Sequence, residues 1–222
     1  MDGVLIHTMP LHATAWLKAV RRRRVSVSEQ EIYQWEGEPG TTTAKRLLKR
    51  HGKSFSKRSL LHLLKDKERL FSRHAKAKRV RIQPGWLKLI GRLRSRRIKL
   101  ALVTGTSARE LHRMLSNRFL ENFQTVIPGD LVSRGKPNPE PYRMAIHAMR
   151  VPNSQAAVIE NAPYGIRSAK LAQCGLVIAL ASSLPVEYLY QADLTFKSSS
   201  QLQSWLLQYL GQIDKSFSTR IQ

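Results

Sequence analysis

Residues 99–105 read Lys-Leu-Ala-Leu-Val-Thr-Gly, a short apolar run that ends in Thr104 and Gly105. A short apolar run closed by a turn residue is typical of a strand that is buried on both faces of a sheet. The sequence predicts a helix on either side of it, at residues 86–97 and 108–117. The stretch therefore predicts one strand of a sheet that helices cover.

The same alternation continues toward the C-terminus. Further strands are predicted at residues 125–128, 156–160, 175–180 and 193–196, and further helices at 140–149 and 165–172. Strands that alternate with helices predict an α/β fold with a doubly wound, Rossmann-like parallel sheet. Ligands bind at the carboxyl ends of the strands in such sheets.

The segment before residue 82 has a different character. Leucines recur there at helical intervals with basic residues between them, Gly37, Pro39 and Gly40 mark a turn, and no strand signal is present. The character changes at Ile82-Gln-Pro-Gly85. We therefore expect an α/β core made of residues 1–12 and 83–222, with an inserted helical cap at residues 13–82.

The chain is strongly basic. Its 38 Lys and Arg residues against 15 Asp and Glu residues give a net charge of +23, and 26 of the 38 bases lie in the first 100 residues. Such a surface attracts polyanions in a salt-dependent way, so non-specific polyanion binding through the basic cap is one hypothesis. The favoured reading is solvated helix faces, because the bases are scattered among leucines and no zinc-finger or RNP-type signature accompanies them.

Membrane and disulfide signals are weak. No apolar run reaches the ~18–20 residues of a membrane span, so no membrane partner is expected. The single cysteine, Cys174, lies in an apolar run and predicts a buried thiol. One cysteine forms no internal disulfide, so we expect a reducing, cytoplasmic setting.

Four short motifs follow one another at predicted strand ends and adjoining loops. They are Asp2-Gly-Val-Leu5, Leu102-Val-Thr-Gly105, Arg134-Gly-Lys-Pro-Asn-Pro139 and Val158-Ile-Glu-Asn-Ala-Pro-Tyr-Gly-Ile166. Together they resemble the haloacid dehalogenase-like phosphatase family, in the branch of β-phosphoglucomutase and phosphoglycolate phosphatase. The resemblance extends over essentially the whole chain, including the helical insertion.

The resemblance implies a role for each motif. Asp2 matches the general acid and base, and its backbone carbonyl matches a metal ligand. Thr104, with the N–H of Gly105, matches the phosphate-holding motif, and Lys136 matches the lysine beside the phosphate and the nucleophile. Glu160 and Asn161 match the acidic pair that holds Mg²⁺, a hard cation that prefers oxygen ligands. Phosphoryl transfer needs these parts together, because it depends on an in-line nucleophile, an acid and positive charge.

The sequence also departs from the family pattern. The nucleophilic Asp of the family stands two residues before Asp2, a position ahead of Met1, and most of the family's first strand is missing too. We therefore expect an incomplete reading of a longer protein that begins at an internal Met, and a pseudoenzyme is the alternative. His7 stands where Asp is usual, and Asn161 stands where Asp is common, with one negative charge less.

The leading hypothesis is a Mg²⁺-dependent phosphatase that hydrolyses a small phosphorylated metabolite, a sugar phosphate, through an aspartyl-phosphate. The cap would close over the site, with a possible hinge contact at His12 and Trp16. A phosphomutase is the closest alternative, but residues 36–43 contain no base that could grip a second phosphate. A catalytically inactive protein that binds nucleic acid through its basic cap is the third reading. We expect a monomer or a weak dimer.

Overall fold

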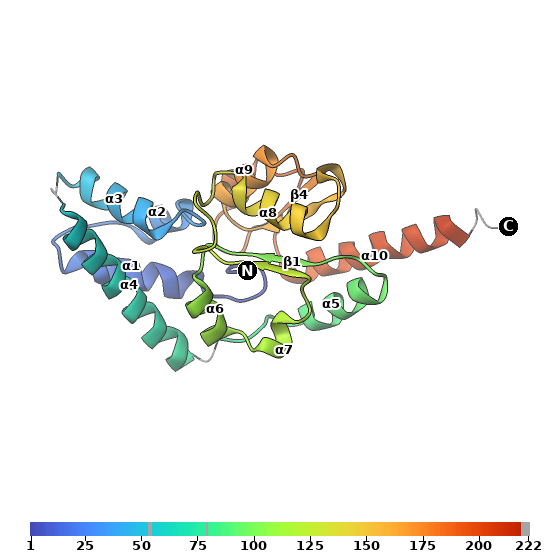
Figure 1. The fold of residues 1–222 in the computed structure, drawn as a ribbon, viewed down its shortest axis with the longest axis horizontal. Helices are drawn as coiled ribbons and strands as arrows, with labels where there is room; N and C mark the ends of the chain where they lie inside the picture. Colours follow the sequence, from blue (N-terminus) through green and yellow to red (C-terminus); the bar gives the residue numbers. More distant parts are fainter. Residues whose placement is uncertain (53–54, 79, 219–222) are drawn as a thin grey trace.

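A computed structural model describes residues 1–52, 55–78 and 80–218. It is elongated: four helices form one end, the strands and their covering helices form the centre, and a long C-terminal helix extends from the other end (Figure 1). None of the helices described is long and apolar enough to span a bilayer.

The four helices at one end form a unit with its own apolar core. They are α1 (Met9–Arg21), α2 (Glu29–Gln34), α3 (Gly40–Arg50) and α4 (Lys57–Lys78). Helices α1 and α4 pack closely, because small buried residues such as Ala15 and Ala19 on α1 face Leu63 and Phe71 on α4. The predicted boundary between residues 12 and 13 falls inside α1, whose buried residues from Leu11 onward join this core.

All ladders in the structure pair parallel strands. The strands are β1 (Ala101–Val103), β2 (Thr125–Ile127), β3 (Ala157–Glu160), β4 (Leu176–Leu180) and β5 (Leu194–Phe196). β1 pairs with β2, and the order in the second sheet is β3-β4-β5. The predicted α/β fold with parallel strands is confirmed.

The described strands form two separate sheets and not the one sheet that the sequence predicts. Within the described residues no ladder joins β1 or β2 to β3–β5. The segment Met1–Ile6 folds as a tight turn, in which the carbonyl of Met1 accepts hydrogen bonds from the N–H groups of residues 4, 5 and 6. The side chains of Val4, Leu5 and Ile6 nevertheless pack with Leu102 of β1 and Ile178 of β4. The two pieces of sheet therefore share one core through this segment, and the N-terminus lies beside β1 (Figure 1).

Helices cover both faces of the strands. They are α5 (Trp86–Ser95), α6 (Ala108–Met114), α7 (Asn117–Leu120), α8 (Glu140–Met149), α9 (Pro163–Leu171) and α10 (Ser199–Ser218), with short 3₁₀ turns at Asn153–Gln155 and Val186–Leu189. Strand β4 shows the layering most clearly. Its Ile178 and Leu180 join the cluster of α5, α6 and α10, whereas its Val177 and Ala179 join that of α8 and α9. This alternation is the doubly wound arrangement that the sequence predicts.

One predicted helix is broken in two. The sequence predicts a helix at residues 108–117, but α6 ends at Met114 because Leu115 adopts an extended conformation. Ser116 then caps α7, accepting a hydrogen bond from the N–H of Phe119. The local cap and the burial of Leu115 and Phe119 override the helical pattern of the sequence.

The core of the α/β part can be tested on α5, where Leu89 is 1% exposed and Leu87 is 60% exposed. Leu89→Ala should lower the free energy of unfolding by about 2–5 kcal/mol, because it leaves a cavity between α5 and the strands. Leu87→Ala, on the same helix, should change it by no more than about 0.5 kcal/mol. Urea denaturation of both variants measures the difference, and equal losses would contradict the layering described above.

Candidate active site

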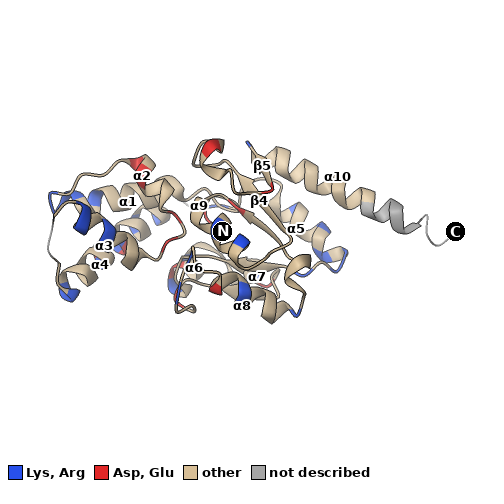
Figure 2. Ribbon diagram, turned by 90° about the horizontal axis from the view of Figure 1, so that it is seen from above, with Lys and Arg blue, Asp and Glu red and all other residues tan. Residues whose placement is uncertain are grey.

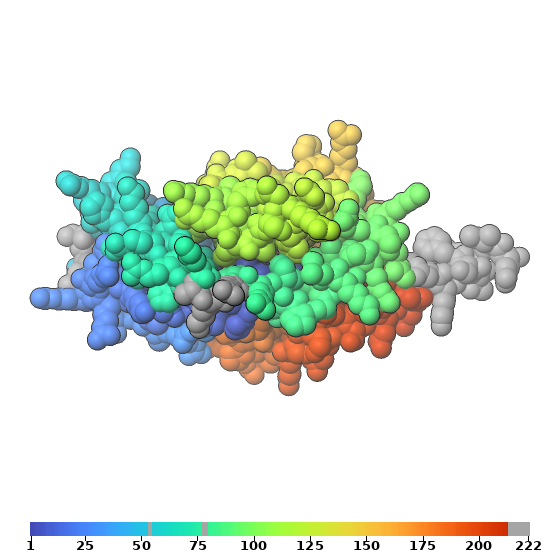
Figure 3. Space-filling view, turned by 90° about the horizontal axis from the view of Figure 1, so that it is seen from below, coloured from blue at the N-terminus to red at the C-terminus, as the bar shows by residue number. Residues whose placement is uncertain are grey.

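One cavity of about 120 Å³ lies between the helical unit and the carboxyl ends of the strands. All six residues singled out in the sequence line it: Asp2, Thr104, Gly105, Lys136, Glu160 and Asn161. Thr104 follows β1 and Glu160 ends β3, so parallel strands deliver both side chains to the same edge. The helical unit, coloured blue to teal in Figure 3, packs directly against the remainder of the chain.

The carboxylate of Asp2 is the most heavily bonded group in the cavity. One of its oxygens accepts hydrogen bonds from Thr106 at 3.1 Å and from Thr104 at 3.3 Å. The other accepts from the hydroxyl of Thr8 and lies 3.4 Å from Nε2 of His12. Burial by itself raises the pKa of Asp2, but the contacts with His12 and Thr8 outweigh it and hold the pKa well below its usual range. Asp2 is therefore ionised in this arrangement.

A chain of contacts runs from Asp2 into the helical unit. His12 on α1 stacks on Phe71 of α4, with the ring centroids 4.0 Å apart. Its Nδ1 lies 3.1 Å from Nζ of Lys67, also on α4. Burial, followed by the charge of Lys67, lowers the pKa of His12. A neutral imidazole that accepts from Lys67 and donates to Asp2 satisfies all three groups. His12 therefore links Asp2 to Lys67 of α4. No sequence pattern distinguishes Lys67 from the many other bases of the chain.

A second cluster surrounds Glu160. Nζ of Lys136 lies 2.5 Å from Oε1 of Glu160, and the hydroxyl of Tyr142 donates to the same oxygen. Lys136 and Glu160 are only 5% and 6% exposed. Burial raises the pKa of Glu160, but Lys136 leads the contacts that lower it overall. A Cβ on Gly165 would stand 2.1 Å from the carboxyl carbon of Glu160, so this position at the start of α9 admits only glycine.

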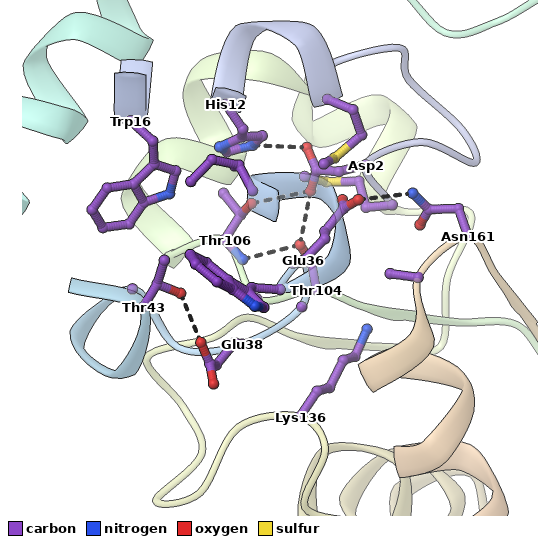
Figure 4. A pocket seen from close by; sticks show the side chains of 18 of the residues that line it. Asp2, His12, Trp16, Glu36, Glu38, Thr43, Thr104, Thr106, Lys136 and Asn161 are labelled. Atoms are coloured by element: carbon purple, nitrogen blue, oxygen red, sulfur yellow. Dashed lines mark hydrogen bonds and ion pairs between the residues drawn. The ribbon is translucent and has the colours of Figure 1, made fainter. Parts of the chain in front are cut away.

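The helical unit contributes the opposite wall of the cavity, where its loop before α3 brings two acidic side chains, Glu36 and Glu38 (Figure 4). Glu38 accepts from Thr43 at 3.1 Å and pairs with Arg46 at 2.5 Å. Glu36 accepts from Nδ2 of Asn161 at 3.0 Å. Burial, followed by repulsion from Asp2 and Glu160, raises the pKa of Glu36 well above its usual value. No sequence pattern marks either acidic role, apart from the absence of bases in residues 36–43.

The charge of the cavity is opposite to that of the chain. Among the described residues, five acidic side chains line it, whereas two Lys or Arg side chains do, Lys67 and Lys136. Figure 2 shows that Lys and Arg spread over helices on the outside, most densely on α3 and α4. The basic surface and the acidic cavity are therefore separate features of the molecule.

The oxygen atoms near Asp2 and Glu160 suit a hard divalent cation. Among the described residues no group of three His, Cys, Asp or Glu side chains lies together as a metal site. The donors that the family resemblance assigns to a metal are the carboxylate of Glu160, the amide oxygen of Asn161 and the backbone carbonyl of Asp2, all of them oxygen atoms of the type that Mg²⁺ prefers. The donor set therefore fits Mg²⁺ by its chemistry.

The sequence pattern of the haloacid dehalogenase-like hydrolases matches residues 1–179. The chain is a haloacid dehalogenase-like hydrolase. This confirms the family resemblance, including the branch of β-phosphoglucomutase and phosphoglycolate phosphatase.

Relatives of this hydrolase are similar over most of their length. Validoxylamine A 7'-phosphate phosphatase of Streptomyces hygroscopicus subsp. limoneus is 30% identical over 203 residues, which are 91% of this chain and 92% of the relative. Phosphorylated carbohydrates phosphatase of Thermotoga maritima is 32% identical over 196 residues, 83% of this chain and 84% of the relative. The structure of CbbY from Rhodobacter sphaeroides in complex with phosphate has a TM-score of 0.73 and 25% identity, covering 91% and 93% of the two chains. β-Phosphoglucomutase from Clostridium difficile, at 23% identity and a TM-score of 0.79 over 94% and 92% of the chains, shows the same fold.

The buried ion pair of this hydrolase gives a stability prediction. Lys136→Met should lower the free energy of unfolding by about 3–5 kcal/mol, because it leaves the buried carboxylate of Glu160 without its cation. The matched control is Lys170→Met, which removes a base from Asp193 in a pair whose side chains are both 38% exposed. That change should cost no more than about 1 kcal/mol. Urea denaturation at pH 7 measures both, and equal losses would show that the pair at Glu160 is not desolvated.

The state of His12 can be measured by NMR titration of its ring carbons, assigned with a His12→Asn variant. We expect the pKa of His12 in the folded protein to lie below the ordinary 6.5. The unfolded chain then binds the proton more readily, so the free energy of unfolding should decrease as the pH falls below 6.5. Lys67→Met should raise this pKa, because it removes a neighbouring positive charge. Lys65→Met, an exposed lysine on the same helix, should leave it unchanged. A His12 that titrates at or above 6.5 in the folded protein would contradict the neutral imidazole.

Proposed function

We propose that this hydrolase is a Mg²⁺-dependent phosphatase that acts on a small phosphorylated metabolite, a sugar phosphate. The observation that carries the proposal is the meeting of Asp2, Thr104, Lys136 and Glu160 in one cavity covered by the helical unit. The names of two relatives, a phosphorylated carbohydrates phosphatase and validoxylamine A 7'-phosphate phosphatase, support this substrate class.

The phosphate group binds at the end of β1. There the hydroxyl of Thr104 and the N–H of Gly105 are donors, and the ammonium of Lys136 is a compact cation. In the structure Lys136 is paired with Glu160, and the buried pair fixes the ammonium in place before a substrate arrives. A fixed cation stabilises charge on the transferring phosphoryl group without having to reorganise.

Asp2 transfers protons. In the family pattern the attacking carboxylate stands two residues before Asp2, at a position ahead of Met1. Its attack on phosphorus forms an aspartyl-phosphate, and the leaving oxygen of the metabolite takes a proton from Asp2. Asp2 then accepts a proton from the water that hydrolyses the aspartyl-phosphate, and phosphate is released. The ionised Asp2 seen here, held by Thr8, Thr106 and His12, corresponds to the second step, in which it acts as the base.

Glu160, Asn161 and the backbone carbonyl of Asp2 are the residues that would hold Mg²⁺. A divalent cation at this edge neutralises charge between the phosphate and the surrounding carboxylates. It suits a cavity in which acidic side chains outnumber basic ones.

Simple hydrolysis is favoured over phosphoryl migration between two positions of a sugar. A mutase must hold a second phosphate, and residues 36–43 on the cap side contain no base. The two lysines that line the cavity already have partners, Lys67 at His12 and Lys136 at Glu160. A second phosphate on the cap side would face Glu36 and Glu38 instead.

The helical unit serves as a cap that excludes water from the reaction. Several hydrogen bonds hold it against the core in the structure. Arg46 donates to the hydroxyl of Tyr164 at 3.2 Å, Gln30 donates to that of Tyr188 at 2.9 Å, and Asn161 donates to Glu36, besides the contacts of Arg113 with Ser72 and of His12 with Asp2. Opening these contacts exposes the cavity for substrate entry and product release.

Activity tests the proposal directly. The chain as given and a version extended ahead of Met1 by a short apolar strand ending in Phe-Asp are assayed with sugar phosphates and p-nitrophenyl phosphate, with Mg²⁺ and with EDTA. We expect turnover in the extended protein only, with inorganic phosphate released and no isomerised sugar phosphate. In that background Asp2→Asn and Lys136→Ala, checked for folding by circular dichroism, should lower kcat by at least about 10²-fold. Lys170→Ala, in an exposed pair on α9, is the control.

Two outcomes would contradict this assignment in different ways. EDTA-sensitive turnover by the unextended chain would show that no carboxylate ahead of Asp2 is needed. A folded, extended protein without activity would favour the pseudoenzyme, with His7 and Asn161 as the first residues to examine. Salt-sensitive binding of DNA to the basic helices α3 and α4 would then be the alternative function.

A further inference from the structure

The contact between Glu36 and Asn161 joins the cap to the core beside the proposed metal ligands. Glu36 lies in the loop between α2 and α3, whereas Asn161 directly follows β3. Nδ2 of Asn161 donates to Oε2 of Glu36 at 3.0 Å. Within the described residues Glu36 forms no ion pair, so this amide is the partner that the structure gives its carboxylate.

An asparagine differs from an aspartate in a way that matters for a cation. Both carboxylate oxygens of an aspartate are ligands, whereas an amide offers one oxygen, and its NH₂ group repels a cation. An asparagine therefore serves as a ligand only in one of its two orientations. Figure 4 shows the nitrogen of Asn161 directed at Glu36 and its oxygen on the other side of the amide.

The surroundings of Asn161 restrict its movement. Asn161 is 3% exposed. A Cβ on Gly3, a residue with φ of +67°, would stand 2.1 Å from Nδ2 of Asn161. The amide is thus packed against the backbone of the Asp2-Gly3 turn on one side and bonded to Glu36 on the other. Because the carboxylate of Glu36 only accepts hydrogen bonds, it favours the orientation in which the amide nitrogen of Asn161, and not its oxygen, faces Glu36.

Glu36 also lines the same cavity as Asp2 and Glu160, the two acidic residues of the proposed site. A divalent cation among these carboxylates removes their mutual repulsion. Glu38, two residues further along the same loop, is bonded differently: it accepts from Thr43 and forms an ion pair with Arg46.

We propose that Glu36 is a positioning residue for Mg²⁺: it accepts the N–H of Asn161, so that the amide oxygen is offered to the cation. The inference rests on the proposed function, because it takes the cation site from there. It also means that the cap contributes to metal binding, so Mg²⁺ uptake and cap closure favour each other.

The test measures Mg²⁺ binding and not turnover. Wild-type protein, Glu36→Gln, Glu38→Gln and the double variant Glu36→Gln/Asn161→Asp are titrated with MgCl₂ by calorimetry, and the melting temperature of each is recorded with and without Mg²⁺. Glu36→Gln should weaken Mg²⁺ binding by about 10-fold or more, because a glutamine amide can pair with either end of the Asn161 amide and no longer holds its oxygen toward the cation. Its Mg²⁺-induced rise in melting temperature should shrink in parallel. Glu38→Gln should bind Mg²⁺ as the wild type does.

The double variant decides whether the effect passes through residue 161. An aspartate there has two ligand oxygens and its own charge, so it should restore the affinity that Glu36→Gln loses. Unchanged affinity in Glu36→Gln, an equal loss in Glu38→Gln, or a double variant that remains weak would each overturn the inference while leaving the phosphatase proposal intact. A wild type that takes up no Mg²⁺ would instead remove the metal from the proposed function, and this inference with it. Melting in EDTA confirms that every variant is folded.

Discussion

The carboxylate of Asp2 accepts hydrogen bonds from two distant parts of the chain. Thr8 and His12 reach it from the start of α1, and Thr104 and Thr106 reach it from the end of β1. A buried carboxylate needs such partners, because an unpaired charge in a low-dielectric interior is costly. The hydrogen bonds to the Asp2 carboxylate therefore fix the start of α1 relative to the end of β1. His12 extends the constraint to α4 through Lys67.

The buried carboxylate of Glu160, on the other side of the cavity, likewise needs partners for its charge. Glu160 is bonded to Lys136, to Tyr142 and to the N–H of Asn161, so its charge is held without exposure to water. The network comes from β3, α8 and the loop before α8, and Gly165 leaves room for it at the start of α9. Because every member is bonded, these side chains are held in position as a site for phosphate and a cation requires.

The distribution of charge separates the surface from the site. The Lys and Arg residues behind the net charge of +23 lie mainly on helices and connecting segments away from the cavity (Figure 2), and most of those described are exposed or half-buried. Acidic residues gather instead at the cavity, on both the cap and the core. Under the proposed function, a phosphorylated metabolite would be drawn by the basic exterior and would meet an interior whose acidic charge lysine and a metal cation balance.

The order of strands and helices could be predicted from the sequence alone, because buried strands and helix faces leave local periodic patterns. The resemblance of four motifs to the haloacid dehalogenase-like family then singled out Asp2, Thr104, Lys136, Glu160 and Asn161 before any coordinates, and parallel strands that end at one edge explain why such motifs meet. What the tertiary structure decided is which side chains face them from elsewhere. Lys67, Glu36 and Tyr142 are ordinary residues of their own helices and loops, and only the packing of α4, the cap loop and α8 against the strands makes them partners of the site. The break in the sheet around Met1–Ile6 also depends on side chains from both pieces meeting in one core. Contacts between residues far apart in the chain leave no local pattern, so the sequence determined the positions of the reactive groups and the fold determined their electrostatic surroundings.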